Sequence, residues 1–392
     1  MKGIFPWILG LTLCAAVTGC AASYGQNEMA AAPVAPGSPV SISYFYDNLS
    51  PDGEWFQHPD YGWCWTPYDL AADWRPYSDG NWEYTDYGWS WASNESFGWA
   101  TYHYGRWFFD DTYGWAWVPG TEWAPAWVAW RSGDDWVGWA PLPPAARWDD
   151  SAGLAYSDAG AIPSDEWCFV QREHMLDVSL SLQLTSVGRN VTLLAGSQDA
   201  TRFEVRGGHP ANLGIDITLF ERNTGRAVPR RHVVDVGAPG RGNGRPAGNG
   251  DVGFFRPVIR PAAPDQPPAP RIQPRPSPIP DADMQRIRDQ RQHKLESDLT
   301  AEHTRLVRDQ DNELRSKAAG AETEALRQRH VAEQQAFDAH AAKQRQVLGQ
   351  RLQKQVVRPA KADRPAKQDN AKDNAQGNDK GQGNDKGKDK GQ

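Results

Sequence analysis

Aromatic residues recur with a fixed period between residues 44 and 150. The motif Tyr-Gly-Trp-x-Trp occurs three times at a step of 26 residues, at 61–65, 87–91 and 113–117. Tryptophans two positions apart on a strand point to the same face, and a glycine before them permits a positive φ at a tight turn. The pattern predicts repeated antiparallel hairpins, closed as a barrel, a sandwich or a stacked array.

A second motif alternates with the first. Trp-x-x-Tyr-x-x-Gly-x-Trp occurs at 74–82 and 99–107, with a looser copy at 127–136. The residue between the two tryptophans of the first motif is small in every copy: Cys64, Ser90 and Ala116. The opposite face of each strand therefore either admits a close second layer or stays open to water. About three units of two short strand pairs each follow from this alternation.

Residues 151–236 show ordinary alternation of apolar and polar positions. Five runs are typical of strands, at 178–184, 190–195, 201–207, 215–222 and 231–236. Turn-forming sequences such as SVGRN and RNTGR separate them. We expect a second small antiparallel β module here, so the N-terminal half of the chain is predicted to be all-β.

The composition changes after residue 236. Residues 237–280 are rich first in glycine and then in proline, which is typical of a linker. Residues 281–357 are highly charged and predict one long helix whose sparse apolar residues follow an eleven-residue step. That stripe comprises Met284, Leu295 and Leu306, then Leu314, Ala325, Ala336 and Val347, beside Leu326, Phe337 and Leu348. It predicts a coiled coil that self-associates, or alternatively a solvated single helix. Residues 358–392 have nothing to bury and are expected to be disordered.

The N-terminus resembles a bacterial lipoprotein signal. Lys2 precedes an apolar run that is too short to span a membrane permanently, and the run ends in Val17-Thr18-Gly19-Cys20. This sequence predicts a signal peptide at 1–19, lipidation of Cys20, and a flexible spacer at 20–43. The alternative is an ordinary secretory signal with an incidental cysteine. Ala21 favours sorting to the outer membrane, on either its periplasmic or its surface face.

Two cysteines remain in the mature chain, Cys64 and Cys168. In an oxidising cell envelope they are candidates for a disulfide that would join the aromatic region to the segment after it. Two buried free thiols are the alternative.

The tryptophans of the aromatic region must build most of its core. Residues 44–150 contain 17 Trp, 10 Tyr and 5 Phe but only six Val, Ile and Leu residues. A buried indole removes roughly 150–250 Å² from water, which is worth about 4–6 kcal/mol gross. Nearby Asp, Asn and Ser side chains are expected to accept the indole N–H groups. A minority of rings remains as a candidate ligand-stacking platform: Trp63, Trp65, Trp89, Trp91, Trp115 and Trp117.

The charge of this region selects among partners. Residues 44–150 carry 17 Asp and Glu against four Arg and no Lys, which argues against nucleic acid because phosphate needs neutralisation. An acidic aromatic surface suits a glycan or peptidoglycan, whose C–H faces stack on indoles.

No catalytic, metal or cofactor site is predicted. Paired carboxylates occur at likely turns, namely Asp110-Asp111, Asp134-Asp135 and Asp149-Asp150, and adjacency in sequence does not place two carboxyls across a cleft. His58 and His103 lack the spacing of metal ligands. His330 and His340 lie on the expected helix and are predicted to be solvated.

The tryptophan repeats, the stretch WCFVQREHMLD and the stretch GIDITLFERNTGRAVPRRHVV together resemble a tryptophan-rich family of Gram-negative envelope proteins. That family is a domain of unknown function with some members labelled FecR-like, and the resemblance covers residues 44–236. It implies an exported protein without assigned catalytic residues.

We therefore expect a lipid-anchored structural or interaction protein of the cell envelope with no enzymatic activity. Its expected partners are the membrane, through the lipid, and further copies of itself, through 281–357. The alternative is a glycan- or peptidoglycan-binding module that uses exposed Trp and Tyr residues, and a glycan hydrolase comes third.

Overall fold

The computed structural model describes residues 34–35, 38–156, 159–239, 243–261, 280–316 and 321–356. These residues belong to one compact unit. The predicted signal peptide at 1–19, the lipidation site Cys20, most of the spacer at 20–43 and the tail at 358–392 lie outside the described residues.

Four antiparallel hairpins form the aromatic region. They pair β2 (Gly53–His58) with β3 (Gly62–Pro67), β4 (Gly80–Thr85) with β5 (Gly88–Ser93), β6 (Arg106–Asp110) with β7 (Gly114–Val118), and β8 (Val128–Ser132) with β9 (Trp136–Pro141). The two full copies of the second sequence motif lead into β4 and β6, and Tyr-Gly-Trp-x-Trp supplies the turn and second strand of the first three hairpins. The turn glycines Gly62, Gly88 and Gly114 have φ of 71°, 81° and 72°, as the motif predicts.

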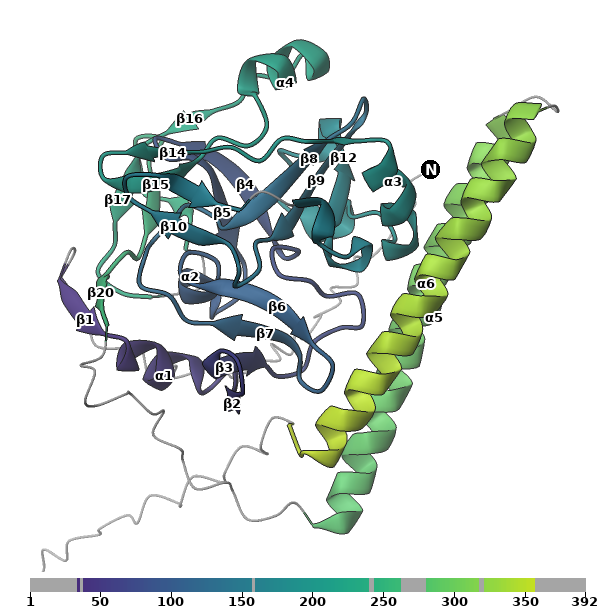
Figure 1. The fold of residues 1–392 in the computed structure, drawn as a ribbon, viewed down its shortest axis with the longest axis horizontal. Coiled ribbons are helices and arrows are strands. Elements are labelled where there is room, and N and C mark those ends of the chain that lie inside the picture. Colours follow the sequence, from purple (N-terminus) through teal and green to yellow (C-terminus); the bar gives the residue numbers. More distant parts are fainter. Residues whose placement is uncertain are drawn as a thin grey trace, which may run out of the picture. The chain divides into compact units, whose positions relative to one another are not determined.

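Three sheets surround the core (Figure 1). Their strand orders are β2-β3-β7-β6, β14-β15-β5-β4-β16 and β12-β9-β8-β13. The strands added to the hairpins are β12 (Cys168–Gln171), β13 (Gln198–Asp199), β14 (Phe203–Arg206), β15 (His209–Asn212) and β16 (Arg230–Arg231). The predicted all-β character of this half is confirmed. Most strands from 151–236, however, extend the hairpin sheets instead of forming a separate module, and the others belong to two small sheets with strands from outside that range.

Three of the five strand-like runs are helical. Residues 178–184 contain the 3-10 turn Leu180–Leu182, residues 190–195 form α3 (Asn190–Ala195), and residues 215–222 overlap α4 (Ile217–Thr224). Caps explain α4: Asp216 accepts hydrogen bonds from Thr218 N and Leu219 N, and Gly225 ends the helix with φ of 67°. These caps outweigh the strand propensity of the β-branched residues.

Part of the predicted linker belongs to the core. Residues 243–261 contain β18 (Arg245–Pro246), β19 (Val252–Phe254) and β20 (Val258–Arg260). Strand β19 pairs with β17 (Val233–Asp235), and β20 pairs with β1 (Pro39–Ser41). Phe254 and Phe255 are buried in the main cluster, so their apolar area holds this glycine-rich segment in place. Residues 262–279 of the linker lie outside the described residues.

Short elements complete the first half: α1 (Ser43–Leu49), α2 (Gly98–Thr101), β10 (Arg147–Asp149) and β11 (Gly153–Ala155).

Each hairpin carries one directly opposed pair of tryptophans. The pairs are Trp55 with Trp65, Trp82 with Trp91, Trp107 with Trp117, and Trp130 with Trp139. Opposed aromatic residues stabilise a strand pair, and these pairs also meet one another. The ring centroids of Trp82 and Trp130, from different hairpins, are 4.5 Å apart. The core is therefore a stack of tryptophan pairs from neighbouring sheets.

Of the indole N–H groups that donate a hydrogen bond, most donate to backbone carbonyl oxygens and not to the side chains we expected. Trp65, Trp107 and Trp117 donate to the carbonyl oxygens of Leu49, Thr101 and Tyr104 at 2.7–3.0 Å. Side-chain acceptors serve Trp74, Trp130 and Trp148, which bond Glu95, Asn212 and Asp150. Trp55, Trp82, Trp91 and Trp123 have buried N–H groups without a partner, so packing outweighs hydrogen bonding at these four.

The predicted long helix is two helices, α5 (Asp281–Ser316) and α6 (Ala321–Gln353). They run antiparallel, because His303 contacts Gln334 while Glu296, nearer the start of α5, contacts Arg345. The eleven-residue stripe is buried at Leu295 and Leu306 of α5. Among the described residues, no helix is long and apolar enough to cross a membrane.

Candidate functional site

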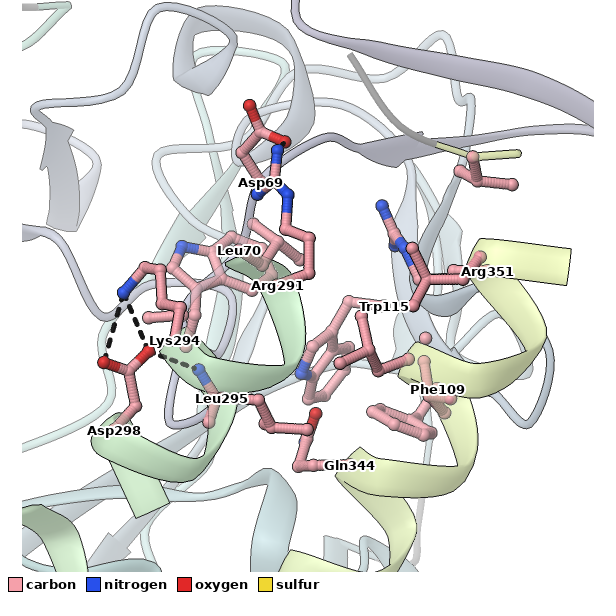
Figure 2. A pocket seen from close by; sticks show the side chains of 18 residues that line it. Asp69, Leu70, Phe109, Trp115, Arg291, Lys294, Leu295, Asp298, Gln344 and Arg351 are labelled. Carbon is pink, nitrogen blue, oxygen red and sulfur yellow. Dashed lines mark hydrogen bonds and ion pairs between the residues drawn. The ribbon is translucent and has the colours of Figure 1, made fainter. Parts of the chain in front are cut away.

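A pocket of about 90 Å³ lies between the α5–α6 pair and the aromatic region (Figure 2). Its walls are mostly apolar, and its polar residues come chiefly from the two helices. The apolar lining includes Leu70, Phe109, Trp115, Leu295, Leu348 and Leu352. The polar lining includes Asp69, Arg291, Lys294, Asp298, Gln344 and Arg351. The residues on both sides come from distant parts of the sequence, so the pocket exists only while the helices are docked.

Arg351 of α6 fixes the helix pair to the first and third hairpins. Its Nη1 donates to Thr66 Oγ1 at 2.9 Å and to the Tyr113 carbonyl oxygen at 2.7 Å, and its Nη2 donates to the Pro67 carbonyl oxygen at 2.7 Å. Burial lowers the pKa of Arg351 to about 10, and the negative charges of Glu54 and Asp69 oppose this shift.

The other two cations of the pocket are paired. Arg291 forms an ion pair with Asp69. Lys294 Nζ lies 2.8 Å from Asp298 Oδ2, which also accepts a hydrogen bond from Ala72 N at 3.4 Å. The pocket lining therefore has three cations and two carboxylates, and the charge of Glu54 also acts on the third cation, Arg351.

Trp115 and Gln344 also line the pocket, and Trp115 is 3% exposed. Phe109 packs edge-on against Trp115 with ring centroids 5.6 Å apart. Figure 2 shows the Trp115 ring between Leu295 of α5 and Arg351 of α6.

Further polar contacts attach the helices beyond the pocket. Glu302 accepts a hydrogen bond from Val187 N at 2.8 Å, and Glu333 accepts one from Thr192 Oγ1 at 2.7 Å. Lys343 Nζ lies 2.9 Å from Asp165 Oδ2. Charged side chains of the α5–α6 pair thus bind the β region. The mixed charges of the helical sequence do not indicate which of them make these contacts.

His330 and His340 are buried, whereas the sequence predicted that they are solvated. His330 Nε2 is 2.9 Å from Glu313 Oε2, and His340 Nε2 is 3.3 Å from the Ala72 carbonyl oxygen. The docking of the helices removes both rings from water, which helical periodicity alone cannot predict.

The six predicted stacking tryptophans lie mostly in the core. Trp65, Trp89, Trp91, Trp115 and Trp117 are buried, and Trp63 is partly exposed. Since a buried ring has no free face, only Trp63 of this set can meet a ligand by stacking in this conformation. Among the described tryptophans none is fully exposed.

Cys64 and Cys168 are free and buried, so the expected disulfide is not formed in this structure. Cys64 packs with Phe56 and Ala116 under the sheet of the first and third hairpins. Cys168 lies in the main cluster, where its Sγ accepts a 3.5 Å hydrogen bond from Arg75 Nε. The two thiols belong to separate hydrophobic clusters. The expectation of a disulfide rested only on the oxidising compartment, and the structure has two buried free thiols instead.

The acidic pairs are turn residues. Asp110 Oδ1 accepts hydrogen bonds from Thr112 N and Tyr113 N at 2.8 and 2.7 Å in the β6–β7 turn. Asp149 Oδ1 plays the same part between β10 and β11, and Asp134 lies between β8 and β9. Among the described residues no group of His, Cys, Asp and Glu is arranged to hold a metal ion.

An aromatic cluster lies at the turn end of the first and third hairpins. The His58 and Tyr61 rings stack with centroids 4.9 Å apart, and Phe108 meets the Tyr61 ring edge-on at 4.8 Å. Tyr61 is 42% exposed, and His58 Nε2 is 3.7 Å from Asp110 Oδ2. The sequence pattern did not indicate this cluster because its strongest repeat consists of tryptophans, although Tyr61 opens the first copy of the repeat motif.

Comparison with curated proteins and with solved structures finds no match. A comparison with protein families finds one over the four hairpins, which agrees with the expected resemblance to a domain of unknown function. Residues 46–146 are similar to the family described as "Family of unknown function (DUF6600)".

Proposed function

We propose that this chain is a lipid-anchored structural or interaction protein of the cell envelope, without enzymatic activity. The observation that supports it most is the use of its chemically capable side chains in scaffolding. Tryptophans fill the core, the acidic pairs cap turns, and the charged residues of α5 and α6 attach the helices to the β region. The sequence Val17-Thr18-Gly19-Cys20 supports the anchor and the outer membrane as its location.

The anchor is tested by expressing the full chain and its Cys20→Ala variant in a Gram-negative host fed an alkyne fatty acid. We expect label and membrane association for the parent chain and neither for Cys20→Ala. Release of the unlabelled parent into the soluble periplasmic fraction would show an ordinary secretory signal instead.

Self-association through 281–357 is part of this proposal. The apolar stripe of the helices is already occupied, because Leu295 and Leu306 pack with Phe337 in one cluster. A contact between copies would therefore use the charged outer faces and weaken with salt. Sedimentation of residues 21–392 at low and high salt tests this, and a monomer at every concentration and salt level would remove self-association from the proposal.

A second candidate is binding of a glycan or peptidoglycan, and the aromatic cluster of His58, Tyr61 and Phe108 favours it. A partly exposed ring beside Asp110 offers a stacking face and an acceptor for hydroxyl groups. Pull-down with purified peptidoglycan tests it: retention of residues 21–392 that Tyr61→Ala reduces and that exposed Leu219→Ala leaves unchanged would support glycan binding. If each of the three proteins were recovered to the same extent with and without peptidoglycan, this candidate function would be removed.

A further inference from the structure

Aromatic rings cover the outer face of the sheet β2-β3-β7-β6. Phe56 is buried there with two small residues, and the side chains packed against these three come from the same sheet or its β6–β7 turn. Phe108 joins this layer to the rings of His58 and Tyr61. Tyr61 is 42% exposed and is the most exposed ring of the layer, so a ligand that approaches this face can reach Tyr61.

One ring of this layer already holds a cation. Lys354 Nζ lies 4.7 Å from the centroid of the Tyr113 ring and 3.4 Å from its hydroxyl oxygen. Tyr113 in turn stacks on Phe56 with ring centroids 3.7 Å apart. A cation over an aromatic ring is attracted by the negative face of its π system. Among the described residues no lysine or arginine lies over the Tyr61 ring.

The surroundings of Tyr61 are negatively charged. Asp60 Oδ2 lies 4.0 Å from His58 Nδ1, and Asp110 Oδ2 lies 3.7 Å from His58 Nε2. Two carboxylates and one imidazole leave the cluster negative in either protonation state of the ring, and the next residue, Asp111, is exposed. An ammonium group over Tyr61 would meet both the ring face and these carboxylates.

We propose that this face binds a glycan whose sugars carry free ammonium groups. An ammonium group lies over the Tyr61 ring and beside Asp60 and Asp110, and a sugar C–H face packs against Phe108. This inference rests on the second candidate function, glycan binding, and adds the charge of the ligand. A neutral sugar would find the same rings and hydroxyl acceptors, so the preference for a cationic over a neutral glycan measures the inference.

Isothermal titration calorimetry on residues 21–392, at low salt and below neutral pH, tests the proposal with four probes. They are hexamers of glucosamine, of N-acetylglucosamine, of glucose and of lysine. We expect the glucosamine hexamer to bind at least tenfold more tightly than each of the other three, and its advantage over the neutral sugars to shrink as salt rises.

The other outcomes separate this inference from glycan binding itself. Equal affinity for the three sugar hexamers would overturn the inference and leave glycan binding in place. Hexalysine that bound as tightly as the glucosamine hexamer would overturn it in favour of any polycation. No binding of any sugar hexamer would remove both the inference and the second candidate function.

Three variants locate the site. Tyr61→Leu removes the π face and should lower affinity for the glucosamine hexamer about threefold, whereas Tyr61→Phe keeps the ring and should leave it unchanged. Asp60 is 78% exposed, so Asp60→Asn should remove its charge without unfolding the chain and should weaken binding of the glucosamine hexamer alone.

Glu204→Gln, at an exposed carboxylate of β14, is the control and should bind like the parent. Thermal melts show whether each variant is folded. Unchanged affinity for the glucosamine hexamer in folded Tyr61→Leu or in Asp60→Asn would contradict the assignment, and should Tyr61→Leu not fold, Asp60→Asn alone decides.

Discussion

Gly80 lies directly beneath the indole of Trp91. A Cβ on Gly80 would come within 2.8 Å of Trp91 Cζ2 and would also overlap the carbonyl oxygen of Ala92. The same relationship recurs in two further hairpins, between Gly53 and Trp65 and between Gly105 and Trp117. The glycine that opens the first strand therefore makes room for the second indole of Tyr-Gly-Trp-x-Trp, which explains why the two sequence motifs alternate.

Replacing Gly80 by alanine should destabilise the protein. The added methyl group meets a packed indole and a backbone oxygen, and overpacking of this kind costs about 1–3 kcal/mol. Urea unfolding of residues 21–392 measures the effect. Gly349→Ala in α6 is the matched control, because nothing lies within 4 Å of its Cβ position, and it should be neutral or slightly stabilising. A similar midpoint for both variants would contradict the close packing under Trp91.

Phe254→Ala should show that the glycine-rich segment is part of the core. Phe254 is fully buried, and truncation of a buried phenylalanine costs about 3–5 kcal/mol. Val258→Ala, at an exposed position of β20, should cost less than about 0.5 kcal/mol. Thermal unfolding followed by near-ultraviolet circular dichroism compares the two. If Phe254→Ala melted with the parent, residues 243–261 would be a linker after all.

Glu95 should make stability depend on pH. Burial raises the pKa of its carboxyl from 4.5 to about 8, although Trp74 and Tyr102 donate hydrogen bonds to it. Between these pH values the folded chain keeps a proton that the unfolded chain has released. The free energy of unfolding therefore falls as pH rises from about 4.5 to 8, by at most about 5 kcal/mol from this group.

Glu95→Gln should flatten that decline, because the amide resembles the protonated acid. Urea unfolding at several pH values from 4.5 to 8 measures the slope for the parent, for Glu95→Gln and for the exposed control Glu204→Gln. Parallel curves for all three proteins would mean that Glu95 is ionised in the folded state throughout this range.

Arg351→Met should loosen the helix pair. The change removes three hydrogen bonds and leaves the carbonyl oxygens of Pro67 and Tyr113 without this donor, at a cost of about 2–4 kcal/mol. Hydrogen exchange read by mass spectrometry should quicken in α6 and stay unchanged in β4–β5. Arg327→Met is the control, since its guanidinium is exposed and pairs with Glu324 of the same helix. Unaltered exchange in α6 of Arg351→Met would show that Arg351 does not hold the helices.

The hairpin repeat could be predicted from the sequence because its signals are local. Gly62, Gly88 and Gly114 mark the turns, and the 26-residue step marks the strands. The arrangement of the hairpins into sheets could not be predicted from the sequence. Pairs such as Trp65 with Trp117 join strands of different repeat units, and neither unit contains a local sequence pattern that specifies its partner. Helix α4 was missed because Ile217 and Thr218 favour strands, and the cap at Asp216 decided otherwise.

The pocket could not be foreseen either. On a helix rich in Arg, Lys, Asp and Glu, residues such as Arg351 and Arg291 resemble a solvated face. Only the docking of α6 against the Gly114 turn shows that Arg351 is half-buried among oxygens from distant strands. The use of tryptophan as core was predictable because so few aliphatic residues were available.

The central claim is that these tryptophans are scaffold, and hydroxyl-radical footprinting with mass spectrometry tests it residue by residue on native residues 21–392. We predict strong oxidation of Trp63 and protection of Trp65, Trp89, Trp91 and Trp117 until the protein is unfolded in urea. Oxidation of Trp89 and Trp91 as fast as that of Trp63 in the native state would contradict the account.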